Sequence, residues 1–217
     1  MAIVIRKSRG RTLRVRRVVS LRYALLAVLT AGPLTGYDAA KRFSSSVGHV
    51  WSAPDSQIYP ELRRMEREGL LVGEEVRWGP NSTKTQYRIT DAGVESFRVW
   101  VNTPLGYSPT RDVHRTQAAY FEWASPESAR QILLAHAAHH ARQVELLTVI
   151  RDGIKAGTDP AISRRLESAP QSDRERIIAY KVHMYDGMIA QANMEIDWAR
   201  EGLDLVNRMN PGRDVDQ

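Results

Sequence analysis

The chain has 217 residues and a formal net charge of +6 at pH 7, with 42% hydrophobic and 26% charged residues. This length allows one large domain or two modest ones, and this composition is typical of a globular protein rather than a disordered or collagen-like one. The sequence contains no cysteine. That excludes disulfide frameworks, thiol nucleophiles and cysteine-ligated zinc or iron–sulfur sites.

The positive charge is concentrated at the N-terminus. Residues 1–17 contain seven basic and no acidic residues, so the remaining 200 residues carry a net charge of −1. We expect this basic arm, residues 1–17, to be disordered. Three interpretations of it stay open: a polyanion-binding extension, a start codon assigned too early and a targeting sequence. Against targeting, the apolar run Tyr23–Leu29 is short and ends at Gly32-Pro33 without a cleavage site. No stretch approaches about 18 uncharged apolar residues, so we expect a cytoplasmic protein.

Residues 18–102 are expected to form one mixed domain that begins with three helices. The first covers Val18–Leu29, which is apolar almost all round, as a buried helix would be. The second covers about residues 36–45 and has the apolar row Tyr37, Ala40 and Phe43. The third begins near Pro54 and is stopped by Gly69. Its expected inward residues are Ile58, Leu62 and Met65.

A hairpin and a fourth helix follow. Residues 70–78 and 85–89 are expected to be strands, joined by a loop of turn residues with a basic tip. Thr90 is a suitable N-cap for a helix that ends near Asn102. Two or three helices followed by a hairpin is the order of a winged helix-turn-helix, whose third helix enters the DNA major groove while the hairpin, or wing, reaches flanking DNA.

The outward side of the third helix and the wing carry groups suited to DNA. Arginines can reach phosphates or guanine edges, and polar side chains in the first helical turn lie where base edges are read. The expected DNA-binding residues are Lys41, Ser56, Gln57, Tyr59, Arg63, Arg64, Arg77, Lys84 and Arg88. Glu61, Glu66 and Glu68 would repel phosphate, so we expect them to face away or to pair with the arginines.

The second half of the chain is expected to be a helical dimerisation domain, residues 114–209. Residues 103–113 contain prolines and a glycine and are the expected linker, and residues 210–217 are the tail. Ser125-Pro126 opens a helix that ends near Gly153 or Gly157. After a turn-rich stretch, Ser172 opens the last helix, which runs to about Met209.

The last helix has apolar residues separated alternately by four and three positions, the seam of a coiled coil. The row consists of Ile178, Val182, Tyr185, Ile189, Ala192, Ile196, Ala199, Leu203 and Val206. Packing between subunits is the favoured explanation, which makes these the expected dimer-interface residues. An intramolecular hairpin with the preceding helix is the alternative.

Three segments together resemble the PadR family of bacterial transcriptional regulators: Leu21–Asp38 (LRYALLAVLTAGPLTGYD), Gln57–Leu71 (QIYPELRRMEREGLL) and Gln86–Gly93 (QYRITDAG). The second half is similar to the helical C-terminal domain of that family, through Ser125–His136 and the pattern Tyr185, Glu195 and Trp198. The resemblance covers residues 18 to about 207. Two features depart from the family pattern: Met65, at a position where leucine is commoner, and the basic arm.

The resemblance implies a dimeric winged-helix repressor that is associated with the bacterial nucleoid. It would bind a palindromic operator in double-stranded DNA. The resemblance places Tyr59 on the DNA backbone, with Ser56 and Gln57 near the bases. The resemblance also implies that a small apolar or phenolic effector releases the protein from DNA. Candidate residues for such a pocket are Tyr120, Trp123, Met184, Met188 and Trp198, because soft and aromatic side chains suit flat apolar ligands, although such residues more often form plain core.

Other functions are weaker alternatives. His136 and His140 are four residues apart, which is the spacing of metal ligands. No second cluster in the sequence completes a metal site, and His140 lies on an apolar row, so a packed or interface histidine is expected. We therefore predict no metal, no cofactor and no catalytic residue. A winged-helix adaptor that binds other macromolecules without sensing a ligand is the main alternative function.

Overall fold

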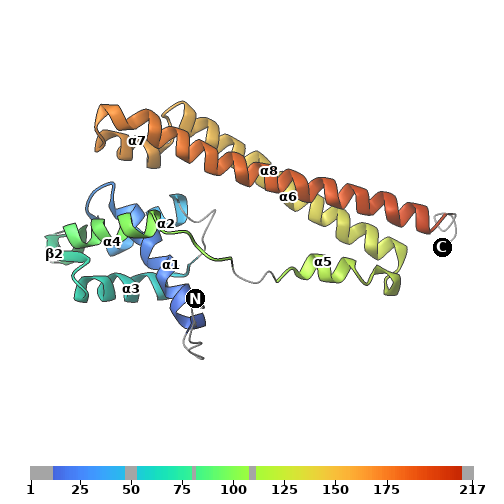
Figure 1. Cartoon of the computed structure of the whole chain (residues 1–217), viewed down its shortest axis with the longest axis horizontal. Helices are drawn as coiled ribbons and strands as arrows, with labels where there is room; N and C mark the ends of the chain where they lie inside the picture. Colours follow the sequence, from blue (N-terminus) through green and yellow to red (C-terminus); the bar gives the residue numbers. More distant parts are fainter. Residues whose placement is uncertain (1–11, 47–52, 80–81, 108–110, 212–217) are drawn as a thin grey trace, which may run out of the picture. The chain divides into compact units, whose positions relative to one another are not determined.

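The computed structural model describes residues 12–46, 53–79, 82–107 and 111–211. The chain forms two compact units, a winged-helix unit within Met1–Leu105 and a helical unit within Gly106–Gln217 (Figure 1). The winged-helix unit contains α1 (Thr12–Leu29), β1 (Leu34–Thr35), α2 (Gly36–Ser46), α3 (Asp55–Arg67), β2 (Leu71–Arg77), β3 (Thr83–Ile89) and α4 (Asp91–Val101). The helical unit contains α5 (Val113–Ala118), the 3-10 helix η1 (Phe121–Trp123), α6 (Pro126–Lys155), α7 (Pro160–Glu167) and α8 (Gln171–Met209).

Helix α1 begins earlier than expected. It starts at Thr12 rather than at Val18, so the last six residues of the basic arm are helical instead of disordered. Residues 12–17 contain neither glycine nor proline, the two residues that most oppose a helix. The expectation for residues 1–11 falls outside the described part of the chain.

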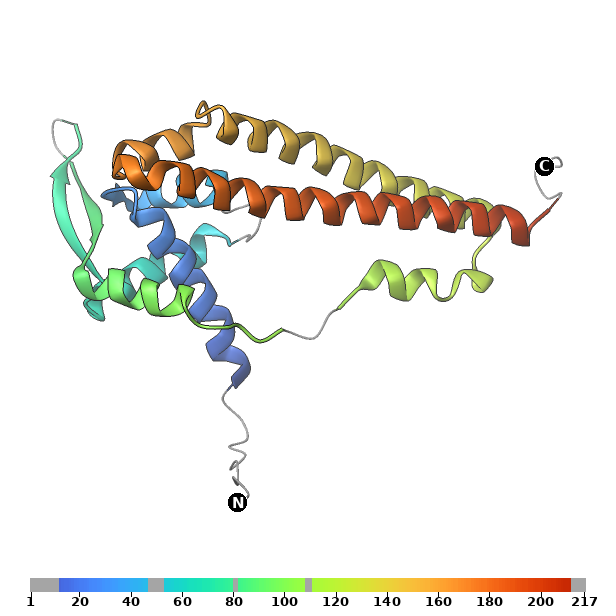
Figure 2. The same ribbon diagram turned by 45° about the horizontal axis from the view of Figure 1, so that its top comes forward.

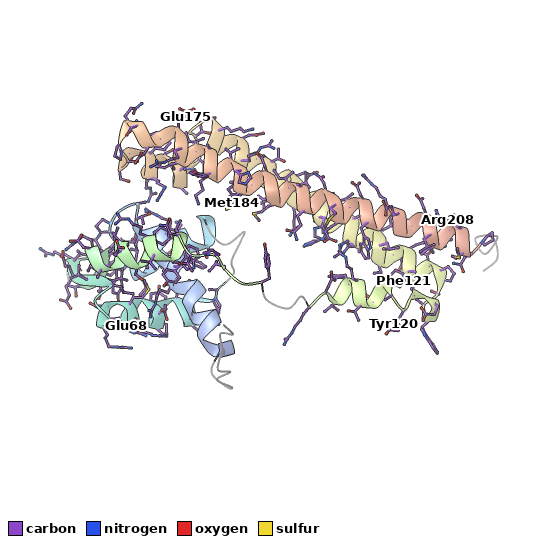
Figure 3. The ribbon with its side chains drawn as sticks, viewed as in Figure 1. Glu68, Tyr120, Phe121, Glu175, Met184 and Arg208 are labelled. Carbon is purple, nitrogen blue, oxygen red and sulfur yellow. The ribbon has the colours of Figure 1, made fainter. Side chains whose placement is uncertain are left out.

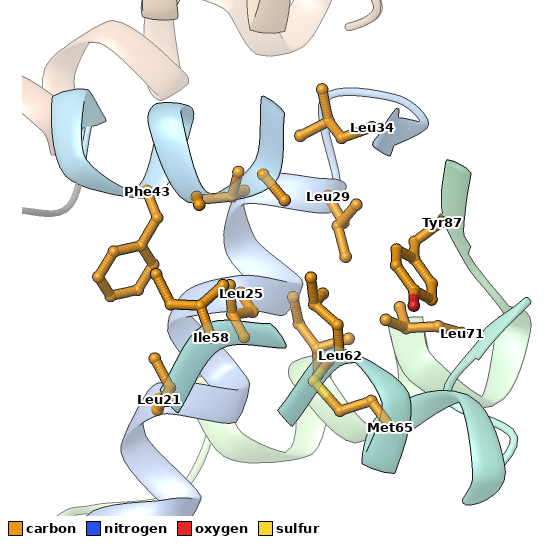
Figure 4. Close-up of a cluster of buried hydrophobic side chains, with 14 residues drawn as sticks. Leu21, Leu25, Leu29, Leu34, Phe43, Ile58, Leu62, Met65, Leu71 and Tyr87 are labelled. Carbon is orange, nitrogen blue, oxygen red and sulfur yellow. The ribbon is translucent and has the colours of Figure 1, made fainter. Parts of the chain in front are cut away.

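The core of the winged-helix unit is formed by the facing sides of α1, α2 and α3 (Figure 4). Leu25 of α1 and the expected inward row of α3 are completely buried; that row is Ile58, Leu62 and Met65. Burying one such side chain contributes about 1.5–3 kcal/mol. In α2 the buried residues are Ala39, Ala40 and Phe43. Tyr37, expected in that row, is instead 58% exposed, and Lys84 Nζ lies 5.6 Å from its ring centroid.

The three strands form an antiparallel sheet in the order β1-β3-β2. The hairpin register pairs Leu71 with Ile89 at its base and Arg77 with Thr83 near its tip. Strand β1 was not expected from the sequence, since two residues are too few to show the alternation typical of a strand. It pairs with β3 and thereby ties the turn after α1 to the wing.

Helix α4 is joined firmly to the base of the hairpin. The side chain of Thr90 accepts a hydrogen bond from Gly93 N (3.1 Å), which confirms it as the N-cap. Its hydroxyl donates to the carbonyl oxygen of Gly69 (2.7 Å), in the turn that ends α3. Gly93 is required here because a Cβ at this position would collide with the carbonyl oxygen of Leu70. Thus the end of α3, the hairpin and α4 form one connected body.

In the helical unit α6 and α8 lie side by side along most of their length (Figure 2). Ser125 caps α6 by accepting from Ser128 N (3.1 Å) and Pro126 is the first helical residue, as expected. Helix α7 was not expected, because its surroundings contain many turn residues. Its start nonetheless has a cap, since Asp159 accepts from Ala161 N and Ile162 N at 2.9 and 3.0 Å.

The apolar row of α8 packs largely within its own chain. Five of its nine members are buried: Tyr185, Ala192, Ile196, Ala199 and Val206. The other four are partly buried against two clusters that include Leu133 and Leu147 of α6. The intramolecular hairpin therefore explains most of the seam, and the row by itself indicates no subunit contact. Among the residues described, no helix combines the length and the hydrophobicity needed to cross a membrane.

Candidate nucleic-acid interface

Helix α3 has a buried face that is largely apolar and an exposed face that is largely polar. Ile58, Leu62 and Met65 are 0% exposed and anchor the helix in the core. Other sides of the helix expose Ser56, Gln57, Arg63, Arg64 and Arg67. The spacing of four and three residues in the buried row is what turns these polar groups outward. The helix therefore offers solvent hydroxyl, amide and guanidinium groups on a rigid support.

The first turn of α3 presents Ser56 and Gln57. Pro54 is the N-cap residue and the helix begins at Asp55, close to Pro54 as expected. The peptide N–H of Gln57 is bonded to Pro54 O (2.9 Å), and the helix dipole is positive at this end. Both side chains are exposed here. A hydrogen-bonding ligand that approaches this end meets the hydroxyl of Ser56 and the amide of Gln57 together.

The ring of Tyr59 packs closely against Gly36 of α2. A Cβ on Gly36, the first residue of α2, would lie 2.8 Å from Cε1 of Tyr59, so the glycine allows the close approach of the ring. Burial raises the pKa of Tyr59, and the nearby carboxylate of Asp55 adds to the effect. The hydroxyl is therefore protonated at neutral pH and can donate a hydrogen bond.

Glu61 of α3 and Glu68, which follows the helix, are paired with arginines of the winged-helix unit, as expected. Arg22 of α1 binds Glu61 Oε1 through Nε (3.0 Å) and Glu68 Oε2 through Nη1 (2.7 Å). Arg64 binds Glu68 Oε1 (2.9 Å) and lies 3.7 Å from Glu61 Oε2. The hydrogen bond from Arg22 lowers the pKa of Glu68 despite partial burial. This network joins α1 to α3 and fixes the orientation of the exposed face.

Arg64 is the predicted DNA-binding residue whose position differs most from the expectation. Its guanidinium is engaged by two carboxylates within the protein, although 45% of the side chain is exposed. It is therefore a positioning residue for α3 first and a candidate ligand contact second. Arg63, next to it on the helix, is exposed and forms the stronger candidate.

The wing carries a cation–aromatic pair that the sequence did not single out. Lys84 Nζ of β3 lies 3.4 Å from the ring centroid of Trp78, which follows β2 and is 52% exposed. Arg88 lies 3.7 Å from Glu74 on the neighbouring strand, with both side chains more than half exposed. Arg77 and, on α2, Lys41 are exposed as well. The predicted polar residues of α2, α3 and the wing thus lie at the surface of the winged-helix unit, with Tyr59 and Lys84 half-buried there. Arg64 and Arg88 have carboxylate partners, and Lys84 has an aromatic one.

The five residues expected to form an effector pocket are not brought together within one chain. Met184 and Met188 pack around Tyr185 and Leu147, whereas Trp198 belongs to the cluster around Leu133. Met184 and Trp198 are about 21 Å apart along α8 at 1.5 Å per residue. Tyr120 is 62% exposed and Trp123 is 86% exposed. Figure 3 shows Met184 and Tyr120 at separate places along the helical unit.

Comparison with known proteins identifies the family of the winged-helix unit. The model of the Transcriptional regulator PadR-like family matches residues 25–99. The negative transcriptional regulator PadR of Bacillus subtilis is 38% identical over 81 residues, which are 37% of this chain and 44% of that protein. The match therefore spans less than half the length of this relative.

Solved structures share the fold over most of the chain. Bacillus subtilis PadR in complex with operator DNA has a TM-score of 0.70 at 23% identity, covering 86% of this chain and 99% of that one. Its complex with p-coumaric acid has a TM-score of 0.65 at 22% identity, covering 88% and 97%. The Vibrio cholerae virulence activator AphA has a TM-score of 0.63 at 25% identity, covering 88% and 99%. The predicted architecture is confirmed, and the winged-helix unit, over residues 25–99, matches the PadR-like family of transcriptional regulators.

Proposed function

We propose that this protein is a sequence-specific DNA-binding transcriptional regulator, with α3 in the major groove and the hairpin β2–β3 on flanking DNA. The observation that carries the proposal is the division of α3 into a buried apolar row and an exposed polar face. A helix-turn-helix protein reads bases from the N-terminal part of such a helix. The complex of Bacillus subtilis PadR with operator DNA supports the proposal through the shared fold.

Each exposed group of α3 has a role that its chemistry suits. Ser56 and Gln57, in the first turn, hydrogen-bond to base edges, and Gln pairs well with adenine. Arg63, two turns further on, binds a phosphate or a guanine edge. The protonated hydroxyl of Tyr59 donates to a phosphate oxygen. Lys41, Arg77, Lys84 and Arg88 add positive charge around this helix, which binds phosphates irrespective of sequence.

We further propose a homodimer formed through the helical unit that reads a palindromic operator with half-sites about 34 Å apart. Since the row on α8 is used mostly within the chain, the dimer contact needs other apolar side chains. Several are exposed on α6 and α8: Leu134, Leu146, Val149, Tyr180 and Met194, at 51–72%. A second copy that covers them would remove this apolar surface from water.

The sense of regulation that we propose is repression, relieved by a small apolar or phenolic effector. The relative in Bacillus subtilis is named a negative regulator, and a structure of it contains p-coumaric acid. Because the five candidate pocket residues do not converge in one chain, an effector site built from them requires the partner subunit or a rearrangement. AphA, which has the same fold, is named a virulence activator. Transcription in vitro with and without the protein therefore tests whether this chain represses or activates.

The experiment is a footprint on DNA upstream of the protein's own gene and its neighbours, at moderate salt. We expect one protected near-palindromic site, and Arg63→Ala to weaken binding by about tenfold, as loss of one good contact of 1–3 kcal/mol implies. Arg98→Ala is the matched control, because Arg98 is an exposed arginine of α4 paired with Glu95. Absence of any protected site contradicts the proposal and favours the adaptor alternative.

A further inference from the structure

A compact group of histidine and glutamate side chains lies inside the helical unit. His136 and His140 are one turn apart on α6, and Glu195 comes from α8. One potential ligand atom from each residue lies within 4.8 Å of those of the other two. Glu195 is only 7% exposed, and the side chain of His136 is 8% exposed. The group is thus largely sheltered from water and held between two long helices.

We propose that His136, His140 and Glu195 bind a divalent transition-metal ion of the Zn²⁺ type. Two imidazoles and one carboxylate form the ligand set of zinc sites that keep a fourth position open. Imidazole suits Zn²⁺ and its neighbours in the first transition row, whereas Mg²⁺ and Ca²⁺ prefer oxygen ligands. The site is separate from α3 and the wing, so the proposal does not rest on DNA binding.

The distances already approach those of a bound ion. His136 Nε2 lies 3.3 Å from Glu195 Oε2. Zinc bonds of about 2.0 Å in a tetrahedron put neighbouring ligand atoms about 3.3 Å apart. A metal ion would therefore replace the hydrogen bond between these two side chains without separating them. Only the remaining ligand, His140, has to move closer, by a change of side-chain rotamer or a small helix shift.

The surroundings orient the ligands as the outer shell of a metal site does. His140 Nδ1 lies 2.9 Å from the side-chain oxygen of Gln143. When Nδ1 donates its hydrogen there, the other ring nitrogen keeps its lone pair for a metal. The ring of Trp198 meets His136 edge-on, with centroids 5.2 Å apart, and restricts its rotation.

Arg115 of α5 is a cation that competes with a metal ion at Glu195. It lies 3.0 Å from Glu195 Oε2 and 3.1 Å from Oε1. Its charge is already balanced by Asp112, at 2.6 Å. A carboxylate has about four lone-pair positions, so Arg115 can remain on Oε1 while a metal binds Oε2. In that position Arg115 orients the glutamate.

The test uses the full chain without an affinity tag, at pH 7.5, with Zn²⁺ as the probe in isothermal titration calorimetry. We expect one Zn²⁺ per chain, a higher unfolding temperature with Zn²⁺ than without it, and no response to Mg²⁺. His140→Ala should weaken Zn²⁺ binding by at least tenfold. His139→Ala is the matched control, since His139 is an exposed neighbour on α6 outside the ligand group, and it should stay within twofold of wild type.

Two results would overturn the proposal. One is the absence of Zn²⁺ binding by the folded wild-type protein. The other is equal Zn²⁺ affinity of the His140→Ala and His139→Ala variants, which would place the ion elsewhere. If His140→Ala does not fold, as judged by circular dichroism, His140→Gln replaces it, and Co²⁺ absorption of the wild type reports the coordination number independently. A wild-type Co²⁺ spectrum without imidazole-type four- or five-coordinate bands counts against the site.

Discussion

The two units place their charged side chains differently relative to their apolar cores. In the winged-helix unit the carboxylates of Glu61 and Glu68 meet Arg22 and Arg64 at the edge of the core, which is itself apolar. In the helical unit Glu195 lies between α6 and α8, among histidines and Arg115. The first arrangement fixes the orientation of α3, whose polar face is exposed. The second puts polar groups in a sheltered interior, where a small ligand or ion can be held.

The largest effect expected is on the core of the winged-helix unit. Leu62→Ala removes a side chain that is 0% exposed and should lower the free energy of unfolding by about 2–5 kcal/mol, because it loses buried surface and leaves a cavity. Denaturant unfolding measures this. Leu105→Ala, at a position 63% exposed, should change it by less than about 0.5 kcal/mol. Equal losses in both variants would contradict the assignment of the core.

A second effect tests the charge network that holds α3. Arg22→Met removes the hydrogen-bond donor of Glu61 and Glu68 and should cost about 1–3 kcal/mol of stability, since Glu61 is buried. It should also weaken the proposed DNA binding, although Arg22 lies on α1 and not on the exposed face of α3. Arg98→Met breaks an exposed pair with Glu95 and should cost less than about 1 kcal/mol. If the two variants behave alike, the network does not position α3.

The smallest effect concerns pH and the interior of the helical unit. Burial lowers the pKa of His140 below its usual value of 6.5, so near pH 6 the folded chain binds fewer protons at this residue than the unfolded chain. This contribution to stability is complete above about pH 7 and is lost as the pH falls through 6.5 toward the lower folded value. The groups facing His140 are His136 and His139 on its own helix and Glu195 on α8, with His114 and Arg115 of α5 beside His136 and Glu195.

The measurement is denaturant unfolding of wild type and His140→Gln at pH 7.5 and 5.5 without metal. We expect the loss of stability between these two pH values to be smaller in the variant, by a fraction of a kcal/mol for a group that is only partly buried. Protonation of Glu195 does not interfere, because its pKa, which burial raises, is lowered overall by hydrogen bonds from Arg115 and His136 and lies below this window. An unchanged difference would show that His140 titrates alike in both states.

Signals confined to a few neighbouring residues were read correctly from the sequence. Thr90 and Ser125 cap their helices because a side-chain oxygen needs only the amides of the next turn. The buried row of α3 followed from its spacing, and so did the pairing of Glu68 with Arg64, one turn away. The start of α1 and the existence of β1 and α7 were missed, since short elements and helix ends carry weak patterns.

The sequence by itself determined which side of each long helix is apolar and that the winged-helix order is present. It did not determine what covers each apolar side: the regular row of α8 was assigned to a second subunit, and the structure packs most of it on α6 of the same chain. Nor did it reveal that Glu195 meets His136 and His140, more than fifty residues earlier. Periodicity is a property of one helix, whereas the partner of a buried face and the third member of a polar cluster are decided only when distant segments pack together.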